Sequence, residues 1–260
     1  MTGSGAEATG FPLPLDLPPM EARLVDDLPA EPGWQFEPKW DGFRCLAFRA
    51  GNEVELRAKS GKPLARYFPE MAEVLRRLEP SRFVLDGELA IPVGETVSFD
   101  ALQMRLHPAE SRIKKLAAET PSVLILFDLL ATPGGESLLQ TPLLQRREAL
   151  DAFFRSIGPN DAVRLSPFTR DTAEARRWLE TSGGALDGVI AKRLDGFTST
   201  ANARCSRSRN GAPRIASSAG SATSGIPRWS ALCSSASTTA RASSTTSGLQ
   251  RPCTTWTASR

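Results

Sequence analysis

One short stretch, EPKWDGFR from Glu37 to Arg44, places a lysine between a proline and a tryptophan and follows it with aspartate, glycine and arginine. A lysine amine is a nucleophile once it has lost its proton, so Lys39 could take part in covalent chemistry. For a lysine chosen at random we would favour a simpler interpretation, in which its aliphatic stem lies along Phe36 and Trp40 and its charge reaches solvent. Residues elsewhere in the chain decide between the two.

Three further fragments carry side chains that could act together with this lysine. LDGEL offers Glu88, LFDLL offers Phe127 and Asp128 near the end of an apolar run, and LDGVIAKR offers Asp187 and Lys192. Each fragment alone is a weak signal, because Asp-Gly pairs usually make turns and an aromatic residue in a strand usually belongs to the core. Taken together, in this order and at this spacing, the fragments are specific.

The fragments resemble the motifs of the covalent nucleotidyltransferases, above all the short bacterial ATP-dependent DNA ligases. KWDGFR matches the family's K-x-D-G-x-R motif, Asp86-Gly87-Glu88 its D-G-E, Phe127 its aromatic residue in a buried strand, and DGVIAK its E-G-x-x-x-K. The resemblance covers residues 28–196. It implies an α+β nucleotidyltransferase fold, the ATP-grasp-like adenylation domain of DNA ligases, with antiparallel sheets.

The resemblance also implies a reaction. Lys39 would attack the α-phosphate of ATP, expel pyrophosphate and form lysyl-AMP; the AMP would pass to the 5′-phosphate of nicked double-stranded DNA, and the 3′-hydroxyl would displace it and seal the nick during repair. The amine must be neutral, and burial and nearby cations can lower its pKa from about 10.4. By the same resemblance Glu37, Arg44, Lys59, Glu88, Phe127 and Lys192 would bind the nucleotide, and Glu88 and Asp187 would bind Mg²⁺.

Finer roles follow from the same matches. Glu37 would accept hydrogen bonds from the adenine edge, Phe127 would stack on adenine, and Arg44 and Glu88 would hold the ribose and its surroundings, while Lys192 would approach the phosphate. Two positions depart from the family pattern. Lys59 stands where relatives usually have arginine, so it keeps the charge and loses the two-pronged hydrogen bonding. Asp187 replaces the commoner glutamate and is one methylene shorter.

Hydrophobic periodicity predicts the elements that must position these residues. It predicts strands in residues 33–59, 82–93, 122–131 and 185–196, and helices in residues 67–80, 141–158 and 171–184. Strands and helices are mixed, with helical insertions between strand pairs, which independently favours an α+β fold with antiparallel sheets. Residues 1–27 are rich in proline and predict an extended N-terminus.

The charge of the chain is unevenly distributed. Its net charge of +3 comes from 32 basic and 29 acidic residues, but residues 197–260 hold eight arginines and no lysine, aspartate or glutamate. The first 196 residues are therefore acidic overall. An argument from basicity to nucleic-acid binding would rest on the tail alone.

The tail, residues 197–260, has the composition of a low-complexity, disordered segment. We interpret it as a stretch read one base out of register from about Phe197. The hidden frame beneath residues 202–210 is compatible with ERAMLKVK, and the one beneath residues 228–248 with an apolar, glycine-punctuated string typical of strands. In the family a K-x-K motif that engages the triphosphate and a small OB-type β-barrel follow the adenylation domain. Both are missing from the visible frame and both fit the hidden one.

We therefore predict a truncated ligase, in which the sheet that carries Lys192 has an unpaired edge, self-adenylylation is feeble or absent, and nick sealing is absent. Three alternatives stay open. The chain could be a non-catalytic nucleic-acid-binding protein with an arginine-rich arm, an RNA ligase or GTP-using capping enzyme, or a pseudogene product without function. Labelled ATP tested against GTP, and DNA binding tested in a Lys39→Ala variant, would separate them.

The remaining features predict a cytoplasmic protein without membrane contact. The resemblance implies a monomer whose partners, besides nicked DNA, would be a repair polymerase or an end-binding protein. No apolar run approaches the roughly 20 residues that span a bilayer. The four cysteines show no metal-ligand spacing, and Cys45 is expected in the core. Arg66 is a candidate for binding near the site. Four basic pairs are expected on solvated helix faces: Arg76-Arg77, Lys114-Lys115, Arg146-Arg147 and Arg176-Arg177.

Overall fold

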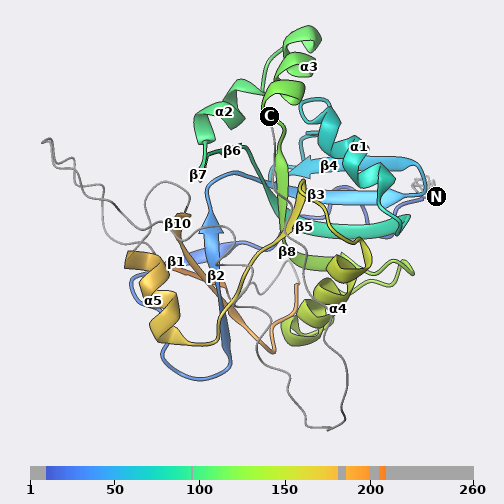
Figure 1. Cartoon of the computed structure of the whole chain (residues 1–260). Helices are drawn as coiled ribbons and strands as arrows, with labels where there is room; N and C mark the ends of the chain where they lie inside the picture. The colour runs from blue at the N-terminus through green and yellow to red at the C-terminus, as the bar shows by residue number, and fades with distance from the viewer. Residues whose placement is uncertain (1–9, 95, 181–185, 199–204, 209–260) are drawn as a thin grey trace, which may run out of the picture.

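The computed structural model describes residues 10–94, 96–180, 186–198 and 205–208, which form two large sheets and a two-stranded one, with helices around them (Figure 1). Among these residues the larger sheet has five strands in the order β4-β3-β5-β8-β9, and the smaller has four in the order β1-β11-β10-β2. The strands pair antiparallel except for β8 with β9 and β1 with β11, which are parallel. The predicted α+β class with antiparallel sheets is confirmed.

The larger sheet contains one interior strand that is nearly continuously apolar. Its members are β3 (Phe43–Ala50), β4 (Glu53–Ala58), β5 (Arg82–Ala90), β8 (Val123–Ala131) and β9 (Val163–Leu165). The nearly continuous apolar sequence of β8 suits its place between β5 and β9, where both of its faces are covered. The turn from β3 to β4 has Gly51 at φ 62°, a left-handed conformation that glycine adopts without steric cost.

Helices cover one face of the larger sheet. α1 (Pro69–Arg77) and α4 (Leu143–Ser156) pack on it through an apolar cluster that includes Met71, Leu75 and Phe153. Arg49 of β3 donates to the carbonyl of Leu75 in the last turn of α1 and to the carbonyl of Pro80 just after the helix. The first of these bonds satisfies a carbonyl that the helix leaves unpaired. No helix in the described part of the chain is both long and apolar enough to cross a membrane.

Two short strands and two further helices lie between β5 and β8. They are β6 (Pro92–Val93), β7 (Thr96–Val97), α2 (Phe99–Met104) and α3 (Glu110–Glu119). Arg105, which follows α2 and is fully buried, donates to the Glu70 carboxylate at the start of α1 and to the carbonyl of Tyr67. This ion pair fixes α2 against α1.

The N-terminal segment, residues 10–21, covers the opposite face of the larger sheet. Leu13 is buried there against Phe48 and Leu130, and Phe11, Leu15 and Leu17 pack around it. Residues before the predicted domain boundary at residue 28 therefore share a core with the sheet. The boundaries 1–27, 28–196 and 197–260 themselves stay predictions.

The smaller sheet consists of β1 (Ala22–Val25), β2 (Trp34–Trp40), β10 (Leu186–Arg193) and β11 (Cys205–Ser208), and α5 (Thr172–Glu180) covers one of its faces. Phe36, Val189 and Ala191 point toward Trp178 of α5. Because side chains alternate along a strand, the residues next to Phe36 on β2 point to the other face of the sheet. Asp171 caps the start of α5, since its carboxylate accepts from the Ala173 amide.

β11 lies within the predicted disordered tail, so that prediction is wrong for residues 205–208. Its register places Ser206 beside Ala191 of β10 and Arg23 of β1, so the predicted unpaired edge next to β10 is also wrong. Backbone amides and carbonyls make these pairings, so a strand that fills a gap between two others needs no particular side chains. The rest of the predicted tail, apart from residues 197 and 198, lies outside the described residues.

Candidate functional site

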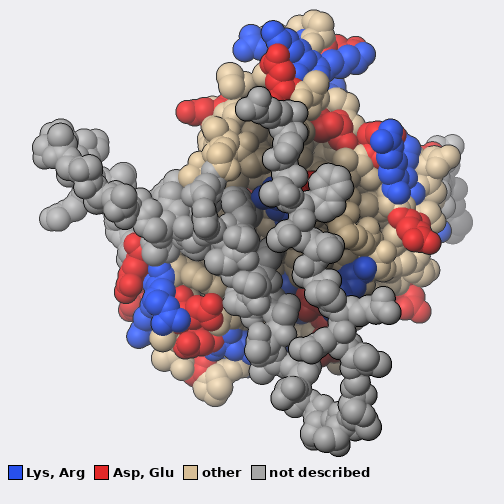
Figure 2. All heavy atoms as spheres, in the orientation of Figure 1, with Lys and Arg blue, Asp and Glu red and all other residues tan. Residues whose placement is uncertain are grey.

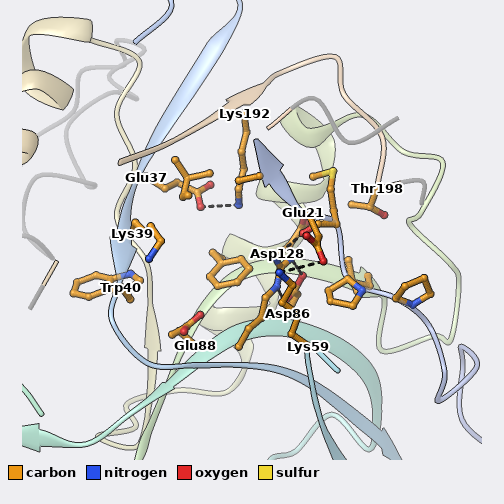
Figure 3. Close-up of a pocket in the computed structure, with 18 of the residues that line it drawn as sticks. Glu21, Glu37, Lys39, Trp40, Lys59, Asp86, Glu88, Asp128, Lys192 and Thr198 are labelled. Atoms are coloured by element: carbon orange, nitrogen blue, oxygen red, sulfur yellow. Dashed lines mark hydrogen bonds and ion pairs between the residues drawn. The ribbon is translucent and has the colours of Figure 1, made fainter. Parts of the chain in front are cut away.

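A cavity of about 220 Å³ lies between the two sheets (Figure 3). Its walls come from the N-terminal segment, from β2, β3, β5 and β8, and from β10. Seven residues that the sequence singled out line it: Glu37, Lys39, Arg44, Lys59, Glu88, Phe127 and Lys192. Residues far apart in the sequence therefore converge on one pocket, as the predicted roles require.

Lys39 lies one residue before the end of β2, and its amine forms an ion pair with Asp187 of β10. The two side chains are 21% and 34% exposed, so the pair is only partly shielded from water. The ladder between β2 and β10 is irregular between Leu186 and Val189, and this bulge sets where Asp187 projects. The amine must therefore leave this carboxylate before it can act as a nucleophile.

Glu88 of β5 lies close to the charges of Arg44 and Lys39. Burial raises the pKa of the Glu88 carboxyl to about 8, although the positive charges of Arg44 and Lys39 oppose that shift. Glu88 and Asp187 both face Lys39, and their oxygens are of the type that Mg²⁺ binds. Among the described residues no group of three metal-ligating side chains comes together, so phosphate or water oxygens would have to complete the coordination of a cation held here.

The raised pKa predicts how stability varies with pH. The folded chain keeps a proton on Glu88 up to about pH 8, whereas an unfolded glutamate loses it near pH 4.5. The free energy of unfolding should therefore fall as pH rises from about 5 to 8, by at most about 1.4 kcal/mol per pH unit from this group. Urea titrations of the wild type and Glu88→Gln, compared at pH 5, 6, 7 and 8, should show a flatter profile in the variant; parallel profiles would contradict the shift.

Arg44 is held rigidly at the back of the pocket. Its guanidinium donates to both oxygens of Asp86, at 3.0 and 2.6 Å, and to the carbonyl of Met20 at 2.6 Å. It also lies 5.3 Å from the centre of the Phe127 ring. Paired hydrogen bonds of this kind fix a guanidinium in one orientation, so Arg44 presents a preorganised charge beside the aromatic ring.

Glu37 and Lys192 pair with each other across β2 and β10. The Lys192 amine donates to Glu37 Oε2 at 2.7 Å, and both side chains are buried. The same amine lies 4.7 Å from the centre of the Phe127 ring. The two residues predicted to bind opposite ends of a nucleotide thus neutralise each other, and a ligand that uses both must separate them.

Trp40, next to Lys39, fixes the end of β2. Its indole nitrogen donates to the Ser166 hydroxyl at 3.0 Å, and Phe36 and Thr169 exchange backbone hydrogen bonds at 2.8 and 2.9 Å. Arg147 of α4 donates to the carbonyl of Ser166 at 3.0 Å. The strand that carries Glu37 and Lys39 is therefore held from α4 as well as from β10.

The expectation that Arg146 and Arg147 lie on a solvated face is wrong. Arg146 is fully buried and donates to both oxygens of Asp128, at 2.9 and 2.8 Å, and to the carbonyl of Gly196 at 3.0 Å. A signal was available, since both arginines fall three or four residues from Leu143 and Leu150 on one helix face. Arg146 thus ties β8 to the connection that leaves β10.

The other basic pairs lie where the sequence placed them, and their three helices leave them exposed. Over α3 the basic and acidic side chains are mixed (Figure 2), because Lys114 pairs with Glu110 and Lys115 with Glu119. Arg66 is exposed, donates to the carbonyl of Pro108 and does not line the cavity. The expectation for Cys45 is confirmed, since it is fully buried and burial raises the pKa of its thiol.

The N-terminal wall of the pocket was missed from the sequence. Met20 supplies the carbonyl that Arg44 binds, and Glu21 pairs with Lys59 at 3.1 Å. More than half of each of these charged side chains is exposed, so this pair contributes little to stability. The alternating leucines of FPLPLDLPP are the signal that this segment packs against a sheet.

Comparisons with known proteins found relatives of this chain in sequence and in fold. A family model described as "ATP dependent DNA ligase domain" matches residues 19–204. DNA ligase C2 of Mycolicibacterium smegmatis is 45% identical over 188 residues, which cover 70% of this chain and 52% of that protein. The chain thus spans about half the length of this curated relative.

Two solved structures resemble the fold. The ligase domain of LigD from M. tuberculosis superposes with a TM-score of 0.57 at 26% identity, over 74% of this chain and 60% of that one. A mycobacterial DNA ligase D complexed with ATP and MES gives a TM-score of 0.50 at 25% identity, over 72% and 60% of the two chains.

Proposed function

The chain belongs to the ATP-dependent DNA ligase family, and from that premise we propose that its pocket binds ATP and that Lys39 takes up AMP from it in a covalent bond. One observation carries the proposal: Lys39 and the six candidate nucleotide-binding residues line a single cavity between the two sheets. The fitting ligand has a flat base for Phe127 and phosphates for the cationic side chains.

The residues of this chain would act in sequence. Arg44, already fixed by Asp86, would hold the ribose beside Phe127. Lys192 would leave Glu37 for the phosphate, and Lys39 would leave Asp187, lose its proton and attack the α-phosphorus, with pyrophosphate as the leaving group. Glu88 and Asp187 would hold Mg²⁺, which would supply positive charge against the phosphate oxygens when bound.

Labelled nucleotides test this proposal directly. We expect the purified 260-residue chain, incubated with α-labelled ATP, to retain label after denaturation, and we expect no retained label with α-labelled GTP. Label from GTP would favour a capping-type enzyme. DNA binding that falls with salt, survives Lys39→Ala and disappears without residues 197–260 would favour the non-catalytic alternative.

We further propose that the whole activity is the sealing of nicked DNA and that it is impaired in this chain, because residues 197–260 are read out of frame. A one-base correction that restores ERAMLKVK should raise covalent labelling and give nick sealing that the 260-residue chain lacks. The assay is conversion of a nicked, end-labelled duplex to full-length product by the two proteins at equal concentration. Sealing by the uncorrected chain would contradict the proposed impairment. Resequencing the codons for residues 195–209 decides whether the frame break is present in the gene.

A further inference from the structure

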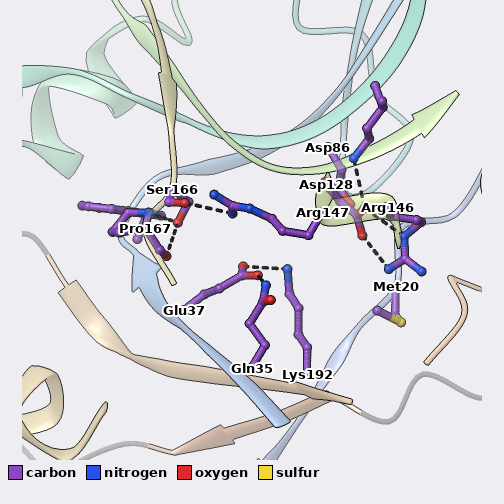
Figure 4. A network of polar contacts seen from close by, with 12 residues as sticks. Met20, Gln35, Glu37, Asp86, Asp128, Arg146, Arg147, Ser166, Pro167 and Lys192 are labelled. Atoms are coloured by element: carbon purple, nitrogen blue, oxygen red, sulfur yellow. Dashed lines mark hydrogen bonds and ion pairs between the residues drawn. The ribbon is translucent and has the colours of Figure 1, made fainter. Parts of the chain in front are cut away.

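A buried glutamine adjoins the pocket without lining it. Gln35 and Glu37 are two residues apart on β2 and so point to the same face of the smaller sheet. Gln35 is fully buried, its partner in the β10 register is Lys192, and its amide nitrogen donates to Glu37 Oε1 at 2.8 Å (Figure 4). Its amide must be oriented this way, because the opposite orientation would set an oxygen against a carboxylate oxygen.

Each oxygen of the Glu37 carboxylate therefore has its own donor. Gln35 occupies Oε1 and Lys192 occupies Oε2. When Lys192 moves to a phosphate, the buried carboxylate loses its cation, and a buried charge without a partner is strongly unfavourable. A base with an exocyclic amine can donate to the vacated Oε2, whereas a base with an oxygen at that position would bring one acceptor against another.

Packing alone does not account for a glutamine at position 35. Its side-chain oxygen is buried and has no hydrogen-bond partner within the described residues. An unsatisfied buried acceptor is unfavourable, so an apolar side chain of the same length would fill this space at lower cost. The amide is useful here for its donor, which points at Glu37.

We propose that Gln35 is a positioning residue that sets the base selectivity of the pocket. By holding Oε1 it fixes the plane of the Glu37 carboxylate, so that Oε2 faces the exocyclic amine of adenine once Lys192 has left. This inference rests on the proposed function, because it concerns how the same pocket selects its nucleotide.

The experiment compares ATP with ITP, whose base lacks the amine. Dissociation constants are measured by calorimetry on the 260-residue chain and on Gln35→Met, which keeps the length and removes the donor. We expect the wild type to prefer ATP, and we expect Gln35→Met to weaken ATP binding roughly tenfold, as for one hydrogen bond to a charged group, with less than about a twofold change for ITP. Gln145→Met, on the exposed face of α4, is the matched control and should change neither.

Two further variants guard the interpretation. Gln35→Asn withdraws the amide by one methylene and should reduce the preference for ATP over ITP, measured by the ratio of their dissociation constants, as Gln35→Met does. This variant replaces Gln35→Met in the test if Gln35→Met does not fold. In a Glu37→Gln background, Gln35→Met should change the ratio no further. If Gln35→Met weakened the binding of both nucleotides equally, or if the wild type bound both equally, the role of Gln35 would be overturned and the proposed function would stand. A wild type that binds neither nucleotide would instead overturn the proposed function.

Discussion

Replacement of Lys39 by arginine should abolish covalent labelling by α-labelled ATP and leave reversible ATP binding within about tenfold of the wild type. Arginine keeps the positive charge that pairs with Asp187, but it stays protonated and cannot act as a nucleophile. The measurement is retained label after denaturation, set beside a dissociation constant from calorimetry. Separating the two readouts distinguishes a nucleophile from a residue that only attracts phosphate.

Lys59→Arg is the control, since it changes a lysine of the same pocket that is more than half exposed. It should retain labelling, and a gain would be consistent with the arginine that relatives usually carry there. Labelling of Lys39→Arg at the wild-type level would show that another residue takes up AMP.

Replacement of Arg146 by methionine should destabilise the fold more than any surface change. It leaves the buried Asp128 carboxylate without its cation, and breaking a buried pair in this way costs about 3–5 kcal/mol. It also removes the hydrogen bonds to the carbonyls of Thr141 and Gly196. We expect the midpoint of thermal unfolding to fall by roughly 10 °C, followed by circular dichroism.

Arg76→Met provides the surface comparison, because Arg76 pairs with Glu73 on the exposed side of α1. Its loss should lower the free energy of unfolding by less than about 1 kcal/mol. The double variant Asp128→Leu with Arg146→Met should recover much of the loss, since it removes both charges together. An Arg146→Met chain that melts within about 2 °C of the wild type would contradict the structural role assigned to this pair.

The sequence predicted the strands that carry the pocket because their patterns are strong. β2 and β4 alternate apolar and polar residues and β8 is nearly continuously apolar, and β2 and β8 place Lys39 and Phe127 at defined positions. Periodicity cannot show which side chains meet. The pairing of Glu37 with Lys192 and of Lys39 with Asp187 depends on β2 lying beside β10, which is a long-range choice.

The wrong predictions for residues 205–208 and for Arg146 have a common physical cause. In both cases contacts with distant parts of the chain outweighed the local amino-acid composition. β11 has the sequence CSRS, yet it pairs between β1 and β10 through its backbone. It also overlaps the segment, residues 202–210, whose hidden frame is compatible with ERAMLKVK. Arg146 is buried because Asp128 neutralises it, and a single helix pattern does not reveal such a partner.

The most direct test of this account is to find where the nucleotide is attached. The 260-residue chain and the frame-corrected chain are incubated with ATP, digested with a protease and mapped by mass spectrometry. We predict AMP on the peptide that contains Lys39, at low occupancy in the 260-residue chain and higher occupancy in the corrected one, with none in Lys39→Arg. AMP on a different residue, or no AMP in either chain, would contradict the claim that the pocket between the two sheets is a site of lysine adenylylation.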